Sequence, residues 1–291
     1  MAKIMIVGSG FVGQANGRVL VDQGHDVVFV DIDPGKIQTL SNLGYKAIST
    51  EEMPGQTADI VFVSVPTPTE ADGVNVQYVC DAMQMVAEHV VSCRSEYVVI
   101  VLKSTVPPGT TRDVVLPILE KYSKKKVGQD FGLVFEPEYL RERTAYQDAL
   151  SPRTVLLGVY DARSAGCLVS IRSVFHCLVE CVSIEDAEMQ KYIHNIFNAT
   201  KITFFNEMRE ICRKMKVDSE KIFDITTRTA EAFWNPHYGV RDFGPFDGAC
   251  LPKDTAGFLA FAKKKLQTDM PLLSAVIHVN KNLPNTKNIQ S

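Results

Sequence analysis

The chain has 291 residues, of which 45% are hydrophobic and 22% charged, and its formal net charge at pH 7 is −3. This composition is typical of a globular protein with room for two domains. The nearly balanced charge excludes the basic surface that nucleic acids and anionic membranes attract, and no apolar run is long enough to span a bilayer.

The seven cysteines are scattered and include no CxxC pair. Cys177 and Cys181 lie close to His176 in the sequence, but no second ligand pair accompanies them, so we predict no metal site. Scattered cysteines in odd number predict free thiols in a reducing compartment, and we therefore expect a cytoplasmic protein. The first motif begins within eight residues of the start, so no signal peptide is expected.

The first half of the chain alternates short apolar runs with helical periodicity. The apolar runs predict strands at Lys3–Val7, Asp26–Val30, Asp59–Val65, Tyr97–Leu102, Gly132–Phe135 and Thr154–Gly158. Amphipathic stretches predict helices at Gln14–Gln23, Gly35–Asn42, Val76–Val91 and Thr110–Tyr122. This alternation predicts an α/β fold with a Rossmann-type, doubly wound parallel sheet, which we assign to residues 1–183.

Near residue 183 the pattern becomes helical throughout. Ser183, with Asp186 three residues later, predicts a helix start, and apolar residues then recur at helical spacing as far as Met215. The result is one helix of about 32 residues, about 48 Å long. Further helices are predicted at Asp218–Ala232, Thr255–Lys264 and Pro271–Lys281. Residues 184–291 should therefore form an all-α domain built on the long helix, which we expect to support a homodimer.

The sequence Gly8-Ser9-Gly10-Phe11-Val12-Gly13 follows the first predicted strand and opens the first helix. Asp31 stands at the end of the second strand, 18 residues after Gly13. The glycines let the backbone approach a pyrophosphate at a helix N-terminus, and the carboxylate accepts hydrogen bonds from the ribose hydroxyls. A carboxylate at this place repels the 2′-phosphate of NADP, so the motif predicts an NAD site.

Four further segments hold groups suited to oxidation chemistry. They are Lys103–Thr110, Glu136–Glu142, Lys191 with Asn195 on one face of the long helix, and Gly248–Asp254 with its thiol, ammonium and carboxylate. A hydride acceptor alone converts an alcohol to a carbonyl. A thiol beside it captures that carbonyl as a thiohemiacetal, which gives a thioester when a second hydride leaves.

On these residues the chain resembles the UDP-glucose/GDP-mannose dehydrogenase family along nearly its whole length. The matching motifs are GSGFVG, VPTPT at Val65–Thr69, KSTVPPGTT, EPEYLRE, KYIHN, the Asn206-Glu207 pair and CLPKD. The resemblance implies an NAD-dependent enzyme that oxidises the C6 alcohol of a nucleotide sugar to a carboxylate, with UDP-glucose as the first substrate to expect. It also implies a role in polysaccharide biosynthesis.

The resemblance further implies a role for each matching residue. Cys250 would be the nucleophile, and Lys191 and Asn195 would stabilise the developing C6 oxyanion. Glu138 would be the general base, and Asp254 and Thr105 would orient a catalytic water. The cofactor-binding residues would be Gly8, Gly10, Phe11, Val12, Gly13, Asp31, Lys36, Thr67, Ser104, Thr105, Val106, Glu142 and Lys253. The substrate-binding residues would be Glu138, Tyr139, Leu140, Glu142, Lys191, Asn195, Arg241 and Phe246.

Two departures from the family pattern concern the substrate. Asp247 replaces a glycine of the run before the cysteine and adds bulk and negative charge beside the expected sugar pocket. Family members also usually continue into a second nucleotide-binding domain. Three alternatives follow. The nucleotide is held by a partner chain or a dimer neighbour, the substrate is a different one, or this chain is a compact variant that binds the nucleotide sugar weakly. The arginine that the family takes from a neighbouring subunit has two possible counterparts, Arg228 and Arg241.

Two other functions stay open at this point. The β-hydroxyacid and 6-phosphogluconate-type dehydrogenases also join a Rossmann domain to a helical one and carry Lys-x-x-x-Asn on a long helix. These enzymes transfer a single hydride and need no cysteine, so the presence of Cys250 favours a nucleotide-sugar 6-dehydrogenase over them. A non-catalytic NAD(H)-binding protein would have no use for Lys191, Asn195 and Cys250 together.

Overall fold

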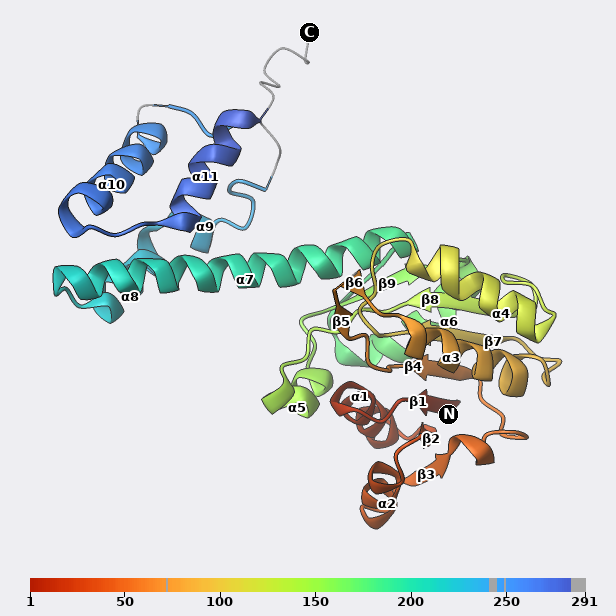
Figure 1. Cartoon of the computed structure of the whole chain (residues 1–291). Coiled ribbons are helices and arrows are strands. Elements are labelled where there is room, and N and C mark those ends of the chain that lie inside the picture. Colours follow the sequence, from red (N-terminus) through yellow and green to blue (C-terminus); the bar gives the residue numbers. More distant parts are fainter. Residues whose placement is uncertain (72, 241–244, 249, 284–291) are drawn as a thin grey trace, which may run out of the picture. The chain divides into compact units, whose positions relative to one another are not determined.

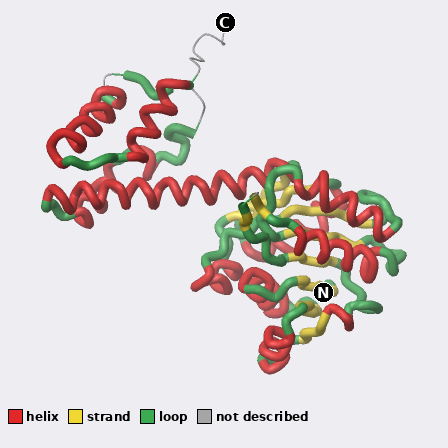
Figure 2. Tube along the Cα trace, viewed as in Figure 1, coloured by secondary structure: helices red, strands yellow, loops and turns green. Residues whose placement is uncertain are grey.

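The computed structural model describes residues 1–71, 73–240, 245–248 and 250–283. The chain forms two compact units, Met1–His194 and Asn195–Ser291, and the division falls inside the long helix. The first unit combines a sheet with helices, whereas the described part of the second is helical (Figures 1 and 2). The domain boundary expected after residue 183 stays a prediction.

An eight-stranded sheet forms the centre of the first unit, in the order β10-β9-β8-β7-β4-β1-β2-β3. Its strands are β1 (Lys3–Val7), β2 (Asp26–Asp31), β3 (Lys46–Ser49), β4 (Ile60–Val63), β7 (Val98–Leu102), β8 (Phe131–Phe135), β9 (Thr154–Val159) and β10 (Leu178–Val182). β5 (Thr69–Glu70) and β6 (Gly73–Val74) form a separate two-stranded antiparallel sheet. The α/β class and the doubly wound sheet expected from the sequence are confirmed.

In this sheet, β8, β7, β4, β1, β2 and β3 are parallel to one another. In contrast, β9 runs antiparallel to β8, and β10 is parallel to β9. Besides a three-residue 3-10 helix at Glu142–Thr144, the connection from β8 to β9 contains the six-residue helix α5 (Ala145–Leu150). Such a helix is about 9 Å long, too short to carry the chain back along a strand of about 17 Å. Phe135 pairs with Gly158, so Thr154 lies beyond the end of β8, and β9 begins at the carboxyl edge of the sheet.

Helices cover both faces of this sheet (Figure 1). One apolar cluster packs α3 (Gln77–Val86) and α4 (Leu116–Ser123) against alternate strand residues such as Met5 and Ile100. The other packs α1 (Phe11–Asp22), α2 (Pro34–Asn42) and α6 (Ala162–Arg172) against residues such as Ile6 and Phe62. Each fully buried aliphatic or aromatic side chain stabilises the fold by about 1.5–3 kcal/mol relative to exposure. The alternation thus fixes which side chains face which helix layer.

The long helix α7 spans Ile184–Met215, which is 32 residues, and the hydroxyl of Ser183 accepts a hydrogen bond from the backbone N–H of Asp186 at 3.1 Å. The other helices of the second unit are α8 (Ser219–Thr229), α9 (Glu231–Trp234), α10 (Leu251–Leu266) and α11 (Pro271–Asn282). A small apolar cluster around Ile211, Ala262 and Met270 holds α7, α10 and α11 together. Within the described ranges, no helix is both long enough and apolar enough to cross a membrane.

Candidate functional site

The loop between β1 and α1 is shaped for close approach of a ligand to the backbone. Gly8 has a φ of +91°, and a Cβ there would lie 2.5 Å from the carbonyl oxygen of Ser64. A Cβ on Gly13 would lie 2.0 Å from the carbonyl oxygen of Gly8. Gly10 caps α1 and has open space around it, and Phe11 and Val12 begin the helix. The helix N-terminus and these glycines fit a dinucleotide pyrophosphate.

Asp31 is the second part of this site. It ends β2, is almost fully buried, and accepts hydrogen bonds from the backbone N–H groups of Ser9 at 2.6 Å and Asp33 at 2.9 Å. Lys36 lies 3.5 Å from the same carboxylate. The buried hydroxyl of Ser9 has no hydrogen-bond partner in the part of the chain that the structure describes. A fixed carboxylate with an unused hydroxyl beside it fits the hydroxyls of an adenosine ribose.

Hydroxyl groups tie the ends of β1, β4 and β7 together at the same edge of the sheet. Ser64 donates to the carbonyl of Gly8 at 3.1 Å, and Ser104 donates to the carbonyl of Val65 at 2.7 Å. Thr67 donates to the carbonyl of Thr105 at 2.9 Å. The structure thus brings the cofactor-binding candidates of three strands to the carboxyl edge, where open α/β sheets bind ligands.

The first turns of α7 bring Lys191 to the segment that follows β8. Glu188 accepts hydrogen bonds from the backbone N–H groups of Gly109 at 2.5 Å and Thr111 at 2.9 Å, which fixes the start of α7 against the KSTVPPGTT loop. One turn later, Lys191 donates to the carbonyl oxygen of Glu138 and lies 3.3 Å from its carboxylate. The side chains of Lys191 and Glu138 are 5% and 15% exposed, so this is a largely desolvated ion pair.

Neighbouring groups hold the same segment. The backbone N–H of Leu140 donates to the Glu138 carboxylate at 2.6 Å, and the hydroxyl of Tyr139 bonds to the Gln190 side chain at 2.5 Å. Burial raises the pKa of Tyr139 to about 12, so this hydroxyl stays protonated. The ring of Tyr139 lies 4.7 Å from that of His194, whose pKa is lowered by burial and by the charge of Lys191. The loop is therefore held rigidly beside Lys191.

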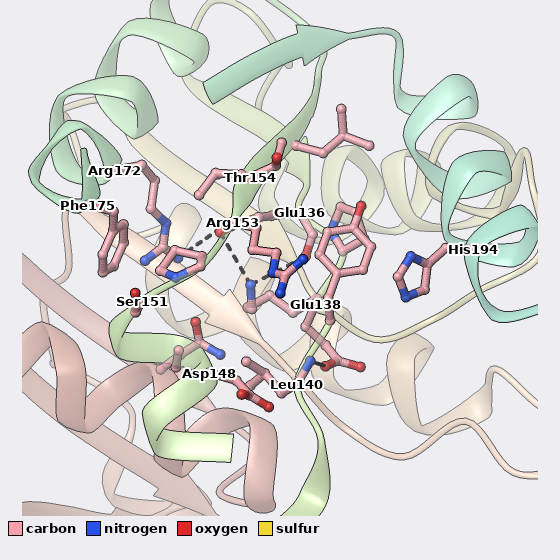
Figure 3. Close-up of a pocket in the computed structure, with 18 of the residues that line it drawn as sticks. Glu136, Glu138, Leu140, Asp148, Ser151, Arg153, Thr154, Arg172, Phe175 and His194 are labelled. Atoms are coloured by element: carbon pink, nitrogen blue, oxygen red, sulfur yellow. Dashed lines mark hydrogen bonds and ion pairs between the residues drawn. The ribbon is translucent and has the colours of Figure 1, made fainter. Parts of the chain in front are cut away.

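A pocket of about 620 Å³ lies behind this loop, between the segments 136–141 and 148–156 (Figure 3). The antiparallel course of β9 creates it, because the start of that strand faces the residues after β8. Arg172 and Phe175 lie at one side of the view, and Glu138 and His194 at the other (Figure 3).

Three buried charged residues line this pocket, and none of them is among the site residues predicted from the sequence. Glu136 lies 3.4 Å from Lys103 and 2.9 Å from Arg172, and the three residues are only 4%, 3% and 2% exposed. Burial alone would raise the pKa of Glu136, but the charges of Arg172 and Lys103 outweigh it and lower that pKa. Burial lowers the pKa of Lys103 against the opposing effect of Glu136. No sequence motif pointed to Arg172, which is the last residue of α6.

The remaining candidates lie in the second unit or on the surface. Cys250 is exposed and caps α10, and Lys253 and Asp254 form an exposed pair at 3.4 Å in its first turn. Asn280 of α11 exchanges hydrogen bonds with the backbone of Phe246 at 2.7 and 3.0 Å. The exposed residues also include Asn195 on α7 and Glu142 after the loop, whereas Arg241 lies outside the described residues. Arg228, the other counterpart of the family arginine, pairs with Asp224 at 2.8 Å.

No group of three or more His, Cys, Asp or Glu side chains is arranged to hold a metal ion among the residues that the structure describes. All seven cysteines are free.

Family models cover most of the chain. The NAD-binding domain of the UDP-glucose/GDP-mannose dehydrogenase family matches residues 2–48 and 40–178, and the central domain of that family matches residues 185–282. Both matches agree with the dinucleotide loop and with the helical second part described above.

Individual relatives agree with the family models. GDP-mannose 6-dehydrogenase of Pseudomonas savastanoi pv. phaseolicola is 33% identical, with 96% of this chain and 68% of the relative covered. UDP-glucose 6-dehydrogenase TuaD of Bacillus subtilis is also 33% identical, with 96% and 63% covered. The crystal structure of a ternary complex of GDP-mannose dehydrogenase from Pseudomonas aeruginosa matches with a TM-score of 0.88 and 29% identity, over 96% of this chain and 68% of that one. The chain belongs to the UDP-glucose/GDP-mannose dehydrogenase family of NAD-dependent oxidoreductases.

Proposed function

We propose that this chain oxidises the C6 alcohol of a nucleotide sugar to a carboxylate in two hydride transfers, with Cys250 holding the intermediate. The observation that carries the proposal is the desolvated Lys191–Glu138 pair, which lies at the same edge of the sheet as the dinucleotide loop. A cation and a carboxylate so placed suit an alcohol that loses both a hydride and a proton.

UDP-glucose and GDP-mannose are the substrates to test first. The first was expected from the sequence, and relatives named for each of the two sugars share 33% identity with this chain. Asp247, an exposed residue three positions before Cys250, is proposed to make the sugar pocket differ from that of the family. A role in polysaccharide biosynthesis is proposed on the same resemblance.

Lys191 is suited to stabilise negative charge on the C6 oxygen. An ammonium group has three donors, and two are used on the carbonyl and the carboxylate of Glu138, so one is available for substrate. Asn195, one turn further along α7, would share this role. Bound NAD would accept the hydride of the first oxidation, and a second NAD, bound after the first NADH has left, would accept that of the second. The residues proposed to hold it are those of the Gly8–Gly13 loop, Asp31, Lys36, Thr67, Ser104, Thr105, Glu142 and Lys253.

Cys250 would carry the covalent part of the reaction. It caps α10, a helix of 16 residues, whose N-terminus favours negative charge on a group placed there. The sulfur would add to the C6 carbonyl carbon to form a thiohemiacetal, which becomes a thioester on the second oxidation. Water would then add to the thioester carbon, Glu138 would take a proton from that water, and the carbon–sulfur bond would break to release carboxylate. Asp254 and Thr105 are proposed to orient the water.

We further propose a homodimer formed through α7. Ile193, Ile196 and Phe197 recur on one face of this helix and are 56%, 60% and 64% exposed in the single chain. Contiguous apolar side chains of this size mark protein interfaces. The seven free cysteines support a reducing compartment such as the cytoplasm.

The deciding measurement is the number of NADH molecules formed per sugar consumed, by absorbance, with UDP-glucose, GDP-mannose and a panel of other UDP- and GDP-sugars. Two NADH per sugar with a uronate product supports the proposal. One NADH per sugar would instead indicate a single-hydride alcohol dehydrogenase. NAD binding without turnover of any sugar would contradict the proposed activity for the chain on its own.

A further inference from the structure

The buried end of the pocket behind the Glu136–Arg141 loop has more positive than negative charge. Lys103 and Arg172 share one carboxylate, that of Glu136, and all three are almost fully buried. The other acidic groups of the lining are engaged elsewhere or exposed. Asp148 pairs with Arg141 at 2.7 Å, Glu138 pairs with Lys191, and Glu180 is exposed to solvent. A buried charge without a counterion is costly, so this end of the pocket favours an anion.

Two guanidinium groups of the lining have unused donors, that of Arg172 at the buried end and that of Arg153 at an exposed position. Arg172 gives one nitrogen to Glu136, but its buried Nε has no acceptor among the described residues. Arg153, on the turn before β9, also lines the pocket, and the described ranges offer it no hydrogen bond or ion pair. The rings of Phe62 and Phe175 lie 5.2 and 5.8 Å from the Arg172 guanidinium and hold it in place. Planar guanidinium groups with free N–H donors bind phosphate and carboxylate oxygens in preference to other ligands.

We propose that the Arg172 end of this pocket binds an oxyanion, the phosphate or carboxylate group of a small ligand, between Arg172 and Arg153. A pocket of about 620 Å³ has room for a small molecule that carries such a group. None of the residues assigned to the dinucleotide in the Gly8–Gly13 loop, nor Asp31 or Lys36, lines it. The site is therefore additional to the cofactor site, although Glu138, Tyr139 and Leu140, which are proposed to bind substrate, also line the pocket.

The lining also suggests how such a ligand would act on the protein. Glu136 and Glu138 belong to one short segment, and both line the pocket. An anion bound to Arg172 would compete with Glu136 for the same guanidinium. Binding of the anion would thus alter the position of Glu138, two residues away, and with it the ion pair between Glu138 and Lys191.

Calorimetric titration of the full chain with inorganic phosphate tests the proposal. Saturating NAD keeps the pyrophosphate loop occupied, and sodium chloride holds the ionic strength constant. We expect one phosphate per chain, bound about tenfold more weakly by Arg153→Gln, because one charge-assisted hydrogen bond is lost. Arg163→Gln is the matched control, since Arg163 is exposed on α6 and outside the pocket lining.

Arg172→Lys is the second variant, with circular dichroism to verify its fold, because it keeps the charge but removes the free Nε. It should also weaken phosphate binding. Absence of saturable binding to the native chain would overturn the proposal, as would equal binding by Arg153→Gln and Arg163→Gln. A parallel titration with acetate assigns the ligand group, since the tighter of the two anions identifies a phosphate or a carboxylate as the natural partner. Turnover of a sugar is not needed for any of these readouts.

Discussion

Lys191 binds both the main-chain carbonyl and the carboxylate of Glu138, a residue 53 positions earlier in the sequence. Lys103 does the same to Glu136, with both its contacts at 3.4 Å. Two lysines from different elements therefore hold two glutamates of one Glu-Pro-Glu turn, each by a backbone and a side-chain oxygen. The turn is fixed from the sheet side through Lys103 and from the α7 side through Lys191.

Lys191→Met should abolish activity and destabilise the fold. The substitution leaves the Glu138 carboxylate largely buried without its cation, which costs about 3 kcal/mol of unfolding free energy. Lys191→Met with Glu138→Gln should regain most of that stability but no activity, because the cation proposed for the C6 oxygen and the proposed general base are both missing. Urea unfolding and NADH formation measure the two effects. Recovery of activity in the double variant would exclude a direct role for Lys191.

Asp31→Asn should weaken NAD binding about tenfold, because a charged hydrogen-bond acceptor for the ribose is lost. It should also narrow the preference for NAD over NADP, since the repulsion of a 2′-phosphate is removed. Asp26→Asn is the control, an exposed residue at the start of the same strand. Fluorescence titration with both dinucleotides measures the ratio, and an unchanged ratio would contradict the assignment of Asp31.

Glu136→Gln should change how stability depends on pH. Burial opposes it, but Arg172 and Lys103 hold the pKa of Glu136 below its usual value of 4.5. A carboxyl with a lower pKa in the folded than in the unfolded state stabilises the fold above the unfolded-state value, and this contribution is lost as pH falls through the folded-state pKa. The variant should lose about 3 kcal/mol at neutral pH and a smaller amount in acid.

Urea unfolding of Glu136→Gln and the native chain between neutral and strongly acidic pH measures this difference. Glu180→Gln is the control, because Glu180 lines the same pocket but is exposed. A constant difference between Glu136→Gln and the native chain across that range would show that the buried carboxylate is not coupled to its two cations.

Cys250→Ser should bind NAD normally but produce no carboxylate, because a hydroxyl at that position is a much weaker nucleophile than a thiolate. Cys167→Ser, an exposed cysteine of the first unit, is the matched control and should be fully active. Mass spectrometry of the products measures carboxylate formation by each of the two variants. Carboxylate formation by Cys250→Ser at the native rate would exclude the covalent route.

Phe197→Asp should convert the proposed dimer to a monomer, because it places a charge within the exposed apolar face of α7. Ala199→Asp is the control, since that residue lies two positions along the helix and about 200° around it. Sedimentation velocity measures the mass of each variant. A native chain that sediments as a monomer, or the same mass for both variants, would contradict the dimer through this face.

Much of the fold was predictable because its central strands are continuous apolar runs. β1, β2, β4, β7, β8 and β9 all carry this signal, and the Ser183 cap located the start of α7 to the residue. The edge strands β3 and β10 were missed, because strands exposed at an edge do not need an apolar run. The reversal of β9 was also missed, since direction depends on how the connection packs rather than on the strand sequence.

The site was predictable in its parts but not in its pairs. Motif positions singled out Glu138 and Lys191 separately, yet their ion pair joins residues far apart in the chain. Arg172 could not be predicted as a pocket residue, because its partner Glu136 is 36 residues away and no motif surrounds it in the sequence. Long-range pairing of charges requires the sheet order and the antiparallel β9, which local patterns do not encode.

The unbroken course of α7 through the division between the two units has a consequence for insertions and deletions. Each residue of an α-helix turns the chain by about 100° and advances it about 1.5 Å. One residue added between His194 and Asn195 would leave Lys191 in place and rotate every later side chain of the helix by that angle. Asn195 would leave the face of Lys191, and the apolar face at Ile196 and Phe197 would turn with it. Length in this part of the chain is therefore constrained as strictly as residue identity.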